Sequence, residues 1–201
     1  MLKGRNLDTA QPYHRRSLLL VCCFSVCIQL GLIRELNAQT YLFSKAQVHF
    51  VSEAPLEIIK ATNKEVSGAI DLAQKSFVVQ IKNKGFQGFN SPLQQEHFFE
   101  NYLEAHKYPK SVFKGKLIDA FDPTTMGNHE VRIKGILDIH GIQQERIVRV
   151  NIQVSPSGIG FSSTFLVQLA DHQISIPRIV HQKIAEEIQV QVLGQLIVKQ
   201  P

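Results

Sequence analysis

Tryptophan is absent from this chain of 201 residues, and all three cysteines, Cys22, Cys23 and Cys27, lie within the first 38 residues. The remainder of the chain therefore has no thiol that could form a disulfide, a thiolate metal site or a cysteine nucleophile. A chain of about 150 residues still buries about 68–70% of its unfolded surface on folding. We therefore expect a single domain that is stabilised by its apolar core.

A large excess of charge of one sign is also lacking. The formal net charge is +5, but the first 38 residues contain five Lys or Arg and two acidic residues, so removing that +3 leaves +2. The segment from Lys82 to Phe89 mixes basic and aromatic residues, as single-strand nucleic-acid binders do. With so few cations, a strand end and turn whose Phe86 and Phe89 point inward is the favoured interpretation, and no nucleic-acid partner is expected.

Residues 1–38 have the layout of a signal peptide. Arg15 and Arg16 precede an apolar run from Ser17 to Ile33, and the small residue Ala38 follows a polar break. The alternative is a retained membrane anchor, because the run reaches the lower end of the about 17–25 residues that span a bilayer. Cleavage after Ala38 is favoured, which predicts a periplasmic or secreted protein whose folded domain comprises residues 39–201.

Beyond the leader, apolar residues recur mostly with period two, which indicates strands with one buried face. Residues 131–139 and 148–154 alternate in this way on either side of His140-Gly141, so they predict a hairpin. Shorter strands are expected at 48–54, 77–81, 112–118 and 161–169. A closing strand is expected at 188–198, with a bulge or bend at Gly194.

The segment from Pro92 to His106 is expected to be helical, with Ser91 as its N-cap and Pro92 as its first residue. A second short helical turn is expected within 179–187. Glu96, Glu100 and Glu104 could supply paired carboxylates for acid–base chemistry, but a solvated helix face is the favoured interpretation. Many short strands with one or two short helices predict an all-β fold, an antiparallel barrel of about eight strands.

Motifs for catalysis are lacking. No Gly-x-Ser-x-Gly elbow is present, and the histidines beyond the leader have no partner at helical spacing. No catalytic residue, metal site or cofactor is therefore predicted, although a metal-dependent hydrolase remains a third hypothesis if histidines converge in space. The positive signal is phenylalanine, because eleven of the twelve lie beyond the leader. Ordinary core packing and a ligand cavity explain that enrichment equally well.

Three stretches together resemble one family. They are Gln95-Glu-His-Phe-Phe-Glu-Asn-Tyr-Leu103 with the following Tyr108-Pro109, Ile133-Lys-Gly-Ile-Leu-Asp-Ile-His-Gly-Ile142, and Leu169-Ala-Asp-His-Gln-Ile-Ser-Ile176. These stretches are similar to the YceI-like family of lipocalin-like β-barrels. The resemblance implies a non-enzymatic bacterial protein, exported to the periplasm, that holds a polyisoprenoid or another amphiphilic lipid in an apolar tunnel. It also implies that the membrane is met only transiently, as the source of lipid, and a homodimer is left open.

Strand and helix periodicity selects the residues expected to line such a tunnel. Ile133, Leu137 and Ile139 should share the inner wall with Val150 and Ile152, and the helix after Pro92 should cover one end. The full candidate ligand-binding set is Phe50, Phe77, Phe98, Phe99, Tyr102, Phe113, Ile133, Leu137, Ile139, Val150, Ile152, Phe161 and Phe165. The alternative function is a structural or interaction protein whose barrel is filled by its own side chains.

Overall fold

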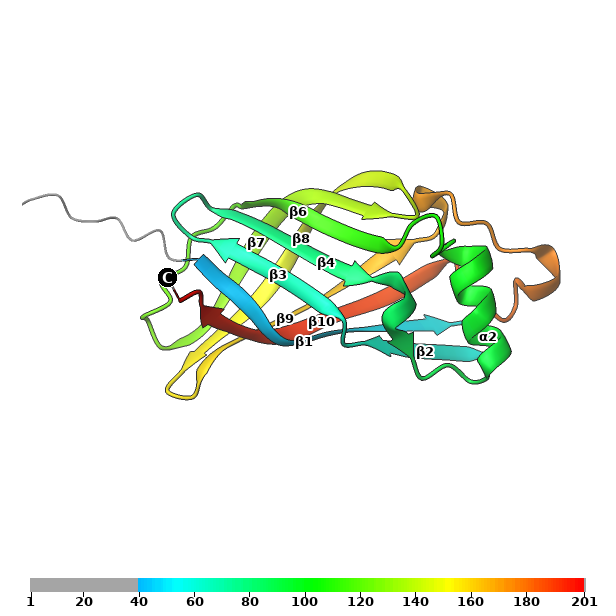
Figure 1. Ribbon diagram of the computed structural model, residues 1–201, viewed down its shortest axis with the longest axis horizontal. Helices are drawn as coiled ribbons and strands as arrows, with labels where there is room; N and C mark the ends of the chain where they lie inside the picture. Colours follow the sequence, from blue (N-terminus) through cyan, green and yellow to red (C-terminus); the bar gives the residue numbers. More distant parts are fainter. Residues whose placement is uncertain (1–39, 201) are drawn as a thin grey trace, which may run out of the picture. The chain divides into compact units, whose positions relative to one another are not determined.

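A computed structural model describes residues 40–200, so the expected signal peptide and its cleavage site lie outside the described residues. The described part is an antiparallel barrel with a short helical segment at one end (Figure 1). Its strands are β1 (Thr40–Glu53), β2 (Ile58–Asn63), β3 (Val66–Asp71), β4 (Ser76–Lys82), β5 (Phe86–Gln87), β6 (Lys110–Leu117), β7 (Gly127–Ile139), β8 (Ile142–Ser155), β9 (Gly158–Gln168) and β10 (Glu187–Val198).

The barrel closes through β1. On one edge β1 pairs with β10, and on the other edge it pairs first with β3 and then with β2. Strands β2 and β3 keep one register against β1, since Val48 lies opposite Asn63 and Tyr41 lies opposite Ile70, so together they act as one long strand. The closed ring therefore has eight strands, which confirms the predicted fold class.

The hairpin of β7 and β8 forms as predicted, with His140 and Gly141 as its two turn residues. Both have positive φ, 56° and 72°, which is the type I′ geometry that matches the twist of the flanking strands. Val131 pairs with Val150 and Ile133 with Val148. The odd-numbered apolar residues of β7 and the even-numbered ones of β8 therefore face the barrel interior.

The irregularity expected at Gly194 lies instead on the neighbouring strand. The register between β1 and β10 shifts between Ser44 and Gln47, and Lys45 has a φ of 49°, so the bulge belongs to β1. Strand β10 continues through Gly194. A Cβ on Gly194 would lie 2.8 Å from Cζ of Phe161. The absence of a side chain at Gly194 therefore leaves room for the Phe161 ring in the core.

The helix begins as predicted but ends early. In α2 (Pro92–His97), Oγ of Ser91 accepts a hydrogen bond from the Gln94 amide at 3.1 Å. A π-helical turn, η2 (Phe98–Tyr102), follows directly. The expected continuation to His106 is wrong, because Glu104 adopts a φ of 42° and this left-handed residue reverses the chain. Single 3-10 turns occur at η1 (Asn83–Gly85), η3 (Ala170–His172) and η4 (Arg178–Val180), the last beginning one residue before the turn expected within 179–187.

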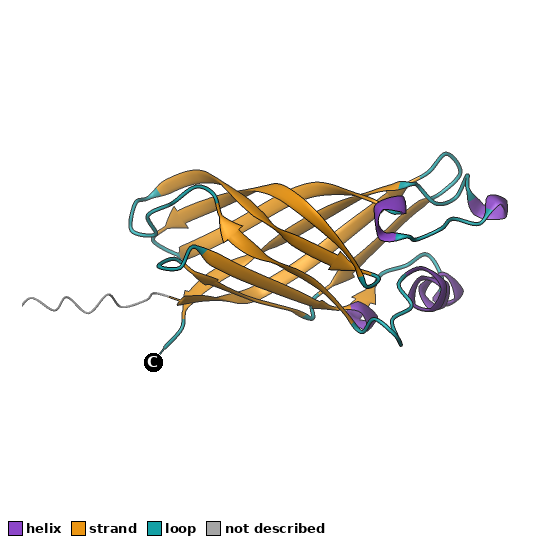
Figure 2. Cartoon of the chain, turned by 90° about the horizontal axis from the view of Figure 1, so that it is seen from above, coloured by secondary structure: helices purple, strands orange, loops and turns teal. Residues whose placement is uncertain are grey.

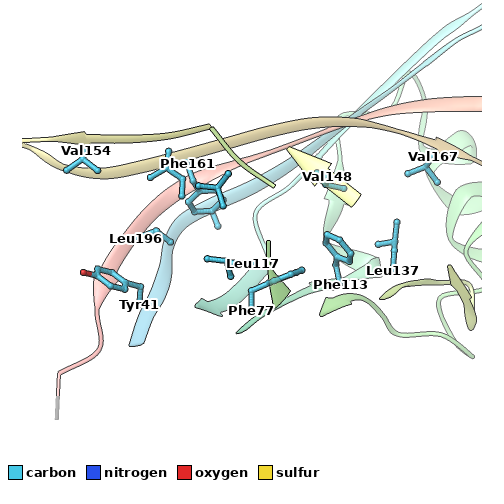
Figure 3. Close-up of a cluster of buried hydrophobic side chains, with 13 residues drawn as sticks. Tyr41, Phe77, Phe113, Leu117, Leu137, Val148, Val154, Phe161, Val167 and Leu196 are labelled. Carbon is cyan, nitrogen blue, oxygen red and sulfur yellow. The ribbon is translucent and has the colours of Figure 1, made fainter. Parts of the chain in front are cut away.

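The apolar interior divides into two clusters of buried side chains. One lines the barrel, where Phe77, Phe113 and Leu137 lie across from Val148 and Phe161 (Figure 3). The other lies at the end that the helical segments cover (Figure 2) and includes Phe50, Ile59 and Phe86. Because the packing of these walls sets the shape of the interior, the two clusters position the site described below.

The hairpin turn generates a stability prediction. A Cβ on Gly141 would lie 2.3 Å from Cε1 of Tyr108, in addition to the strain of a positive φ. Gly141→Ala should therefore lower the free energy of unfolding by about 1–3 kcal/mol, measured by urea denaturation. Gly160→Ala is the matched control, because a Cβ there meets nothing closer than 3.9 Å. Equal effects of the two substitutions would contradict the prediction.

Candidate ligand-binding cavity

An inner cavity of about 120 Å³ lies within the barrel. Its walls come from all eight strands of the ring and are almost entirely aliphatic and aromatic, with Ser111 and Ser163 as exceptions. Both hydroxyls already have partners: Ser111 donates to Oδ1 of Asn83 at 2.8 Å, and Ser163 donates to the Arg149 carbonyl at 2.6 Å. The inner cavity therefore favours apolar groups.

A second, outer cavity of about 380 Å³ lies beneath the helical segment. Residues of β1, β2, α2 and the loop between β9 and β10 surround it, and Phe50, Phe86 and Phe98 are prominent in its wall. The two cavities share five lining residues, Ile81, Ser111, Ile139, Val167 and Val190. The two cavities therefore adjoin each other, and the outer one reaches the surface at exposed lining residues such as Leu93 and Lys183.

Four phenylalanines form an aromatic cluster in the outer cavity. The ring of Phe50 stacks on that of Phe98 with centroids 5.2 Å apart, and it meets Phe86 and Phe89 edge-on at 5.4 and 5.9 Å. Such offset and edge-on contacts are the favoured aromatic geometries. The cluster therefore holds the helical segment against the barrel while presenting ring surface to the cavity.

The structure brings the sequence-predicted residues together, with one exception. The inner cavity is lined by Phe77, Phe113, Ile133, Leu137, Ile139, Val150, Ile152, Phe161 and Phe165, and the outer cavity by Phe50, Phe98, Tyr102 and Ile139. Contact with a ligand remains a prediction for all of them.

The exception is Phe99, which lines neither cavity. It borders a shallow outer depression with Lys84, Glu96 and His106, and its ring packs against Phe89 and Phe98. Phe98 and Tyr102 are four residues apart and therefore share a helix face, whereas Phe99 is rotated about 100° away from them. The expectation that Phe99 covers the cavity directly is thus not what the geometry shows.

Several cavity residues were missed by the sequence-based selection. Phe43 lines the inner cavity, but it lies in the first half of β1. The sequence pattern predicts a strand only from Val48 onward, so it does not include Phe43. Val190 and Val192 also line it, and their alternation in β10 was the signal that could have found them. Ile184 was not accessible in this way, because it lies in an irregular loop.

Polar side chains gather at the outer cavity. Oε1 of Glu57 accepts hydrogen bonds from Asn90 at 3.1 Å and Gln94 at 2.9 Å, and Ser52 accepts one from the Ala185 amide at 2.9 Å. Burial raises the pKa of Tyr102, so its phenol stays protonated at neutral pH. An apolar interior with a polar mouth suits an amphiphile whose tail points inward.

A cluster around His140 joins the covering segments to the β7–β8 turn. Nε2 of His140 lies 3.0 Å from Oε2 of Glu104, and its Nδ1 lies 3.1 Å from the carbonyl of His172. Desolvation acts to raise the pKa of Glu104, but the hydrogen bond with His140 and the charge of Lys107 outweigh it and lower that pKa. Glu104 is therefore an ion-pair residue, while Glu96 and Glu100 are exposed as expected.

The neighbouring His172 is fully buried, with its Nδ1 3.1 Å from the Ile142 carbonyl. Burial lowers its pKa from the ordinary 6.5. Sequence spacing had left these histidines isolated, and the fold brings His140 and His172 together. Residues 40–200 contain no group of three or more His, Cys, Asp or Glu side chains arranged to hold a metal ion. No helix in the same range is long and apolar enough to cross a membrane.

The closed eight-stranded ring with an apolar interior, covered at one end by a helix, defines a lipocalin-like barrel. Residues 42–196 match the YceI-like domain, and because this match spans more than half of the chain, the protein belongs to the YceI-like family. No curated protein sequence matches the chain.

Solved structures share this fold. A polyisoprenoid-binding domain from Saccharophagus degradans, implicated in plant cell wall breakdown, has a TM-score of 0.66 at 16% identity, covering 82% of this chain and 99% of that one. BcnA from Burkholderia cenocepacia has a TM-score of 0.62 at 18% identity, with 78% and 97% covered. The YceI protein of Campylobacter jejuni has a TM-score of 0.52 at 20% identity, with 69% and 84% covered. At sequence identities this low, the structural similarity establishes a shared fold alone.

The buried histidine generates a pH prediction. Because the pKa of His172 is lower in the folded state, the unfolded chain binds the proton more readily, and His172 reduces stability as the pH falls below about 6.5. The stability advantage of the wild type over His172→Gln, measured by denaturation from about pH 7.5 to about pH 5, should therefore shrink toward acid. A difference that stays constant over this range would contradict the assignment.

The two adjacent phenylalanines generate a binding prediction. Phe98→Ala should weaken binding of an apolar fluorophore, because it removes a ring from the outer cavity wall. Phe99→Ala is the matched control, with the same change in side chain and a similar partial exposure, but it should leave fluorophore affinity unchanged. Both variants should lose less than the about 3–5 kcal/mol typical of a fully buried Phe. Equal losses of affinity would show that the helix acts as a whole.

Proposed function

We propose that this protein binds a hydrophobic or amphiphilic small molecule, with a polyisoprenoid lipid as the leading candidate, and performs no chemistry on it. The observation that carries the proposal is the pair of adjoining, mostly apolar cavities inside the barrel, which share five lining residues. Membership of the YceI-like family supports this proposal. So does the similarity of fold to a domain described as polyisoprenoid-binding.

The dimensions and chemistry of the cavity agree with this function. The two volumes, about 120 and 380 Å³, together fall in the range of about 300–1,000 Å³ that is usual for small-molecule pockets. Each Å² of apolar surface removed from water contributes about 25 cal/mol before the costs of association are met. Burial of apolar surface is therefore the main driving force expected for binding.

The proposal extends to location. Export through the signal peptide at residues 1–38 would place the protein in the periplasm or outside the cell, where a lipid has to be shielded from water in transit. The membrane then serves as the transient source of the lipid. The alternative function, a structural or interaction protein with a filled barrel, predicts that no apolar molecule enters.

Filling the inner cavity tests the proposal. The wild type, purified from a host that makes polyprenyl lipids, should yield such a lipid on extraction and mass spectrometry, and it should brighten an apolar fluorophore that prenyl lipids displace. Val150→Phe should weaken this displacement, because its larger ring enters the inner cavity. Ile147→Phe, on the exposed outer face of the same strand, is the matched control. Empty protein with no fluorophore response would support the filled-barrel alternative.

A further inference from the structure

Strands β8 and β9 are neighbours in the ring but pair along only part of their length. Their backbone ladder covers Asn151–Ser155 and Gly158–Ser162, at the end of the barrel away from helix α2. Toward the covered end, residues 142–150 of β8 and 163–168 of β9 form no ladder with each other, although each stretch is paired on its other side with β7 or β10. We call this unpaired interval the β8–β9 seam.

Side chains bridge the seam where backbone pairs are missing. At the point where the ladder stops, Oγ of Ser163 donates to the Arg149 carbonyl at 2.6 Å. At the covered end, Nδ1 of His172 lies 3.1 Å from the Ile142 carbonyl. Each bridge gives a β8 carbonyl the partner that a neighbouring strand would otherwise supply. Opening the seam therefore breaks side-chain contacts and leaves the backbone ladders on either side intact.

Between these two bridges, Asp171 holds Arg146 and Gln144. The Asp171 carboxylate forms an ion pair with Arg146, and the Asp171 carbonyl accepts a hydrogen bond from Nε2 of Gln144 at 2.7 Å. Nε of Arg146 and Nε2 of His172 are buried without a hydrogen-bond partner in residues 40–200. A buried polar nitrogen without a partner carries a desolvation cost that contact with water removes. The closed seam is therefore less stable than a fully bonded wall would be.

The seam separates the inner cavity from solvent. Val148 on β8 and Val167 on β9 line that cavity and belong to the buried cluster of Figure 3. On the outer side, Ile147 is 62% exposed and Leu166 is 53% exposed. The register of the paired half, continued into the seam, places these two residues opposite each other. Apolar side chains therefore lie on both the inner and the outer face of the seam.

We propose that the β8–β9 seam is a lateral entrance through which a chain-shaped apolar ligand reaches the inner cavity. This role rests on the proposed ligand-binding function. A long chain that enters from the covered end has to be threaded, end first, past the outer cavity, where the ring of Phe50 packs against those of Phe86, Phe89 and Phe98. Through the open seam the same chain passes sideways, and the side-chain bridges form again behind it.

Cross-linking the seam tests this route. Ile147→Cys/Leu166→Cys, joined by a short bismaleimide, ties the seam on its outer face, and neither residue lines a cavity. Leu166→Cys/Gln189→Cys, joined in the same way, is the matched control, because these two residues pair in the continuous ladder between β9 and β10. In both proteins the three cysteines of residues 1–38 are replaced by serine, so that the introduced thiols alone react. The association rate, dissociation rate and affinity of an apolar fluorophore are measured before and after cross-linking.

Tying the seam should slow both association and dissociation of the fluorophore about tenfold and leave its affinity unchanged, because a barrier on the route changes both rates equally. The cross-linked control should keep the rates it had before cross-linking. A second variant needs no reagent: Asp171→Asn removes the ion pair with Arg146 and should raise both rates severalfold. Asp119→Asn, which removes the ion pair with Arg132 elsewhere on the barrel, should leave them unchanged.

Unchanged rates in the cross-linked Ile147→Cys/Leu166→Cys protein would overturn the proposal and leave the covered end as the route. A wild type that takes up no fluorophore would contradict the proposed function instead, and amide hydrogen exchange would then decide whether the seam opens. Exchange in residues 142–150 that is slowed by the seam cross-link but not by the control cross-link would support opening. Equal exchange in the two cross-linked proteins would overturn it.

Discussion

Pairing of β1 with β10 is the constraint on which the rest of the structure depends. It joins the first and last described strands, and the Lys199 amide extends the join by donating to the Thr40 carbonyl at 2.8 Å. Closure removes both sheet edges, which would otherwise present unpaired backbone groups. It also encloses the interior, so the inner cavity exists because the ring is complete. The bulge in β1 and the missing side chain at Gly194 let this join pass over the ring of Phe161.

An eight-stranded ring has an interior that side chains can fill or that can hold one small ligand. In this barrel the aromatic rings lie against the walls in edge-on pairs, as Phe77 and Phe113 do with centroids 5.0 Å apart, and a cavity remains between the walls. The polar groups that reach this space are occupied by neighbouring protein atoms. The covered end differs, because polar and charged side chains collect there and the cavity meets the surface.

Between β8 and β9, the covered end is held by side chains rather than by the sheet ladder. Strands β8 and β9 pair over Asn151–Ser155 and Gly158–Ser162, and nearer the covered end their connection passes through side chains of Ser163, Gln144 and His172. His140 adds the link to Glu104. Side-chain contacts of this kind can open at a lower free-energy cost than a continuous backbone ladder. A cavity entrance that opens to admit a ligand needs such a low cost.

Local pattern was enough to predict the β7–β8 hairpin, the inward face of each of its strands, the Ser91 cap and the all-β class, because side-chain alternation and capping depend on neighbours in sequence. It could not choose between Phe98 and Phe99, since both fit an amphipathic helix and only the packed π-helical turn sets which ring meets the cavity. It could not place the bulge opposite Gly194 or bring Glu104 to His140, which lies in a distant hairpin. The sequence by itself determined which residues form strands and which face of each is apolar. The tertiary structure alone decided how those faces leave two adjoining cavities, because a cavity is the volume that side chains from many strands jointly fail to fill.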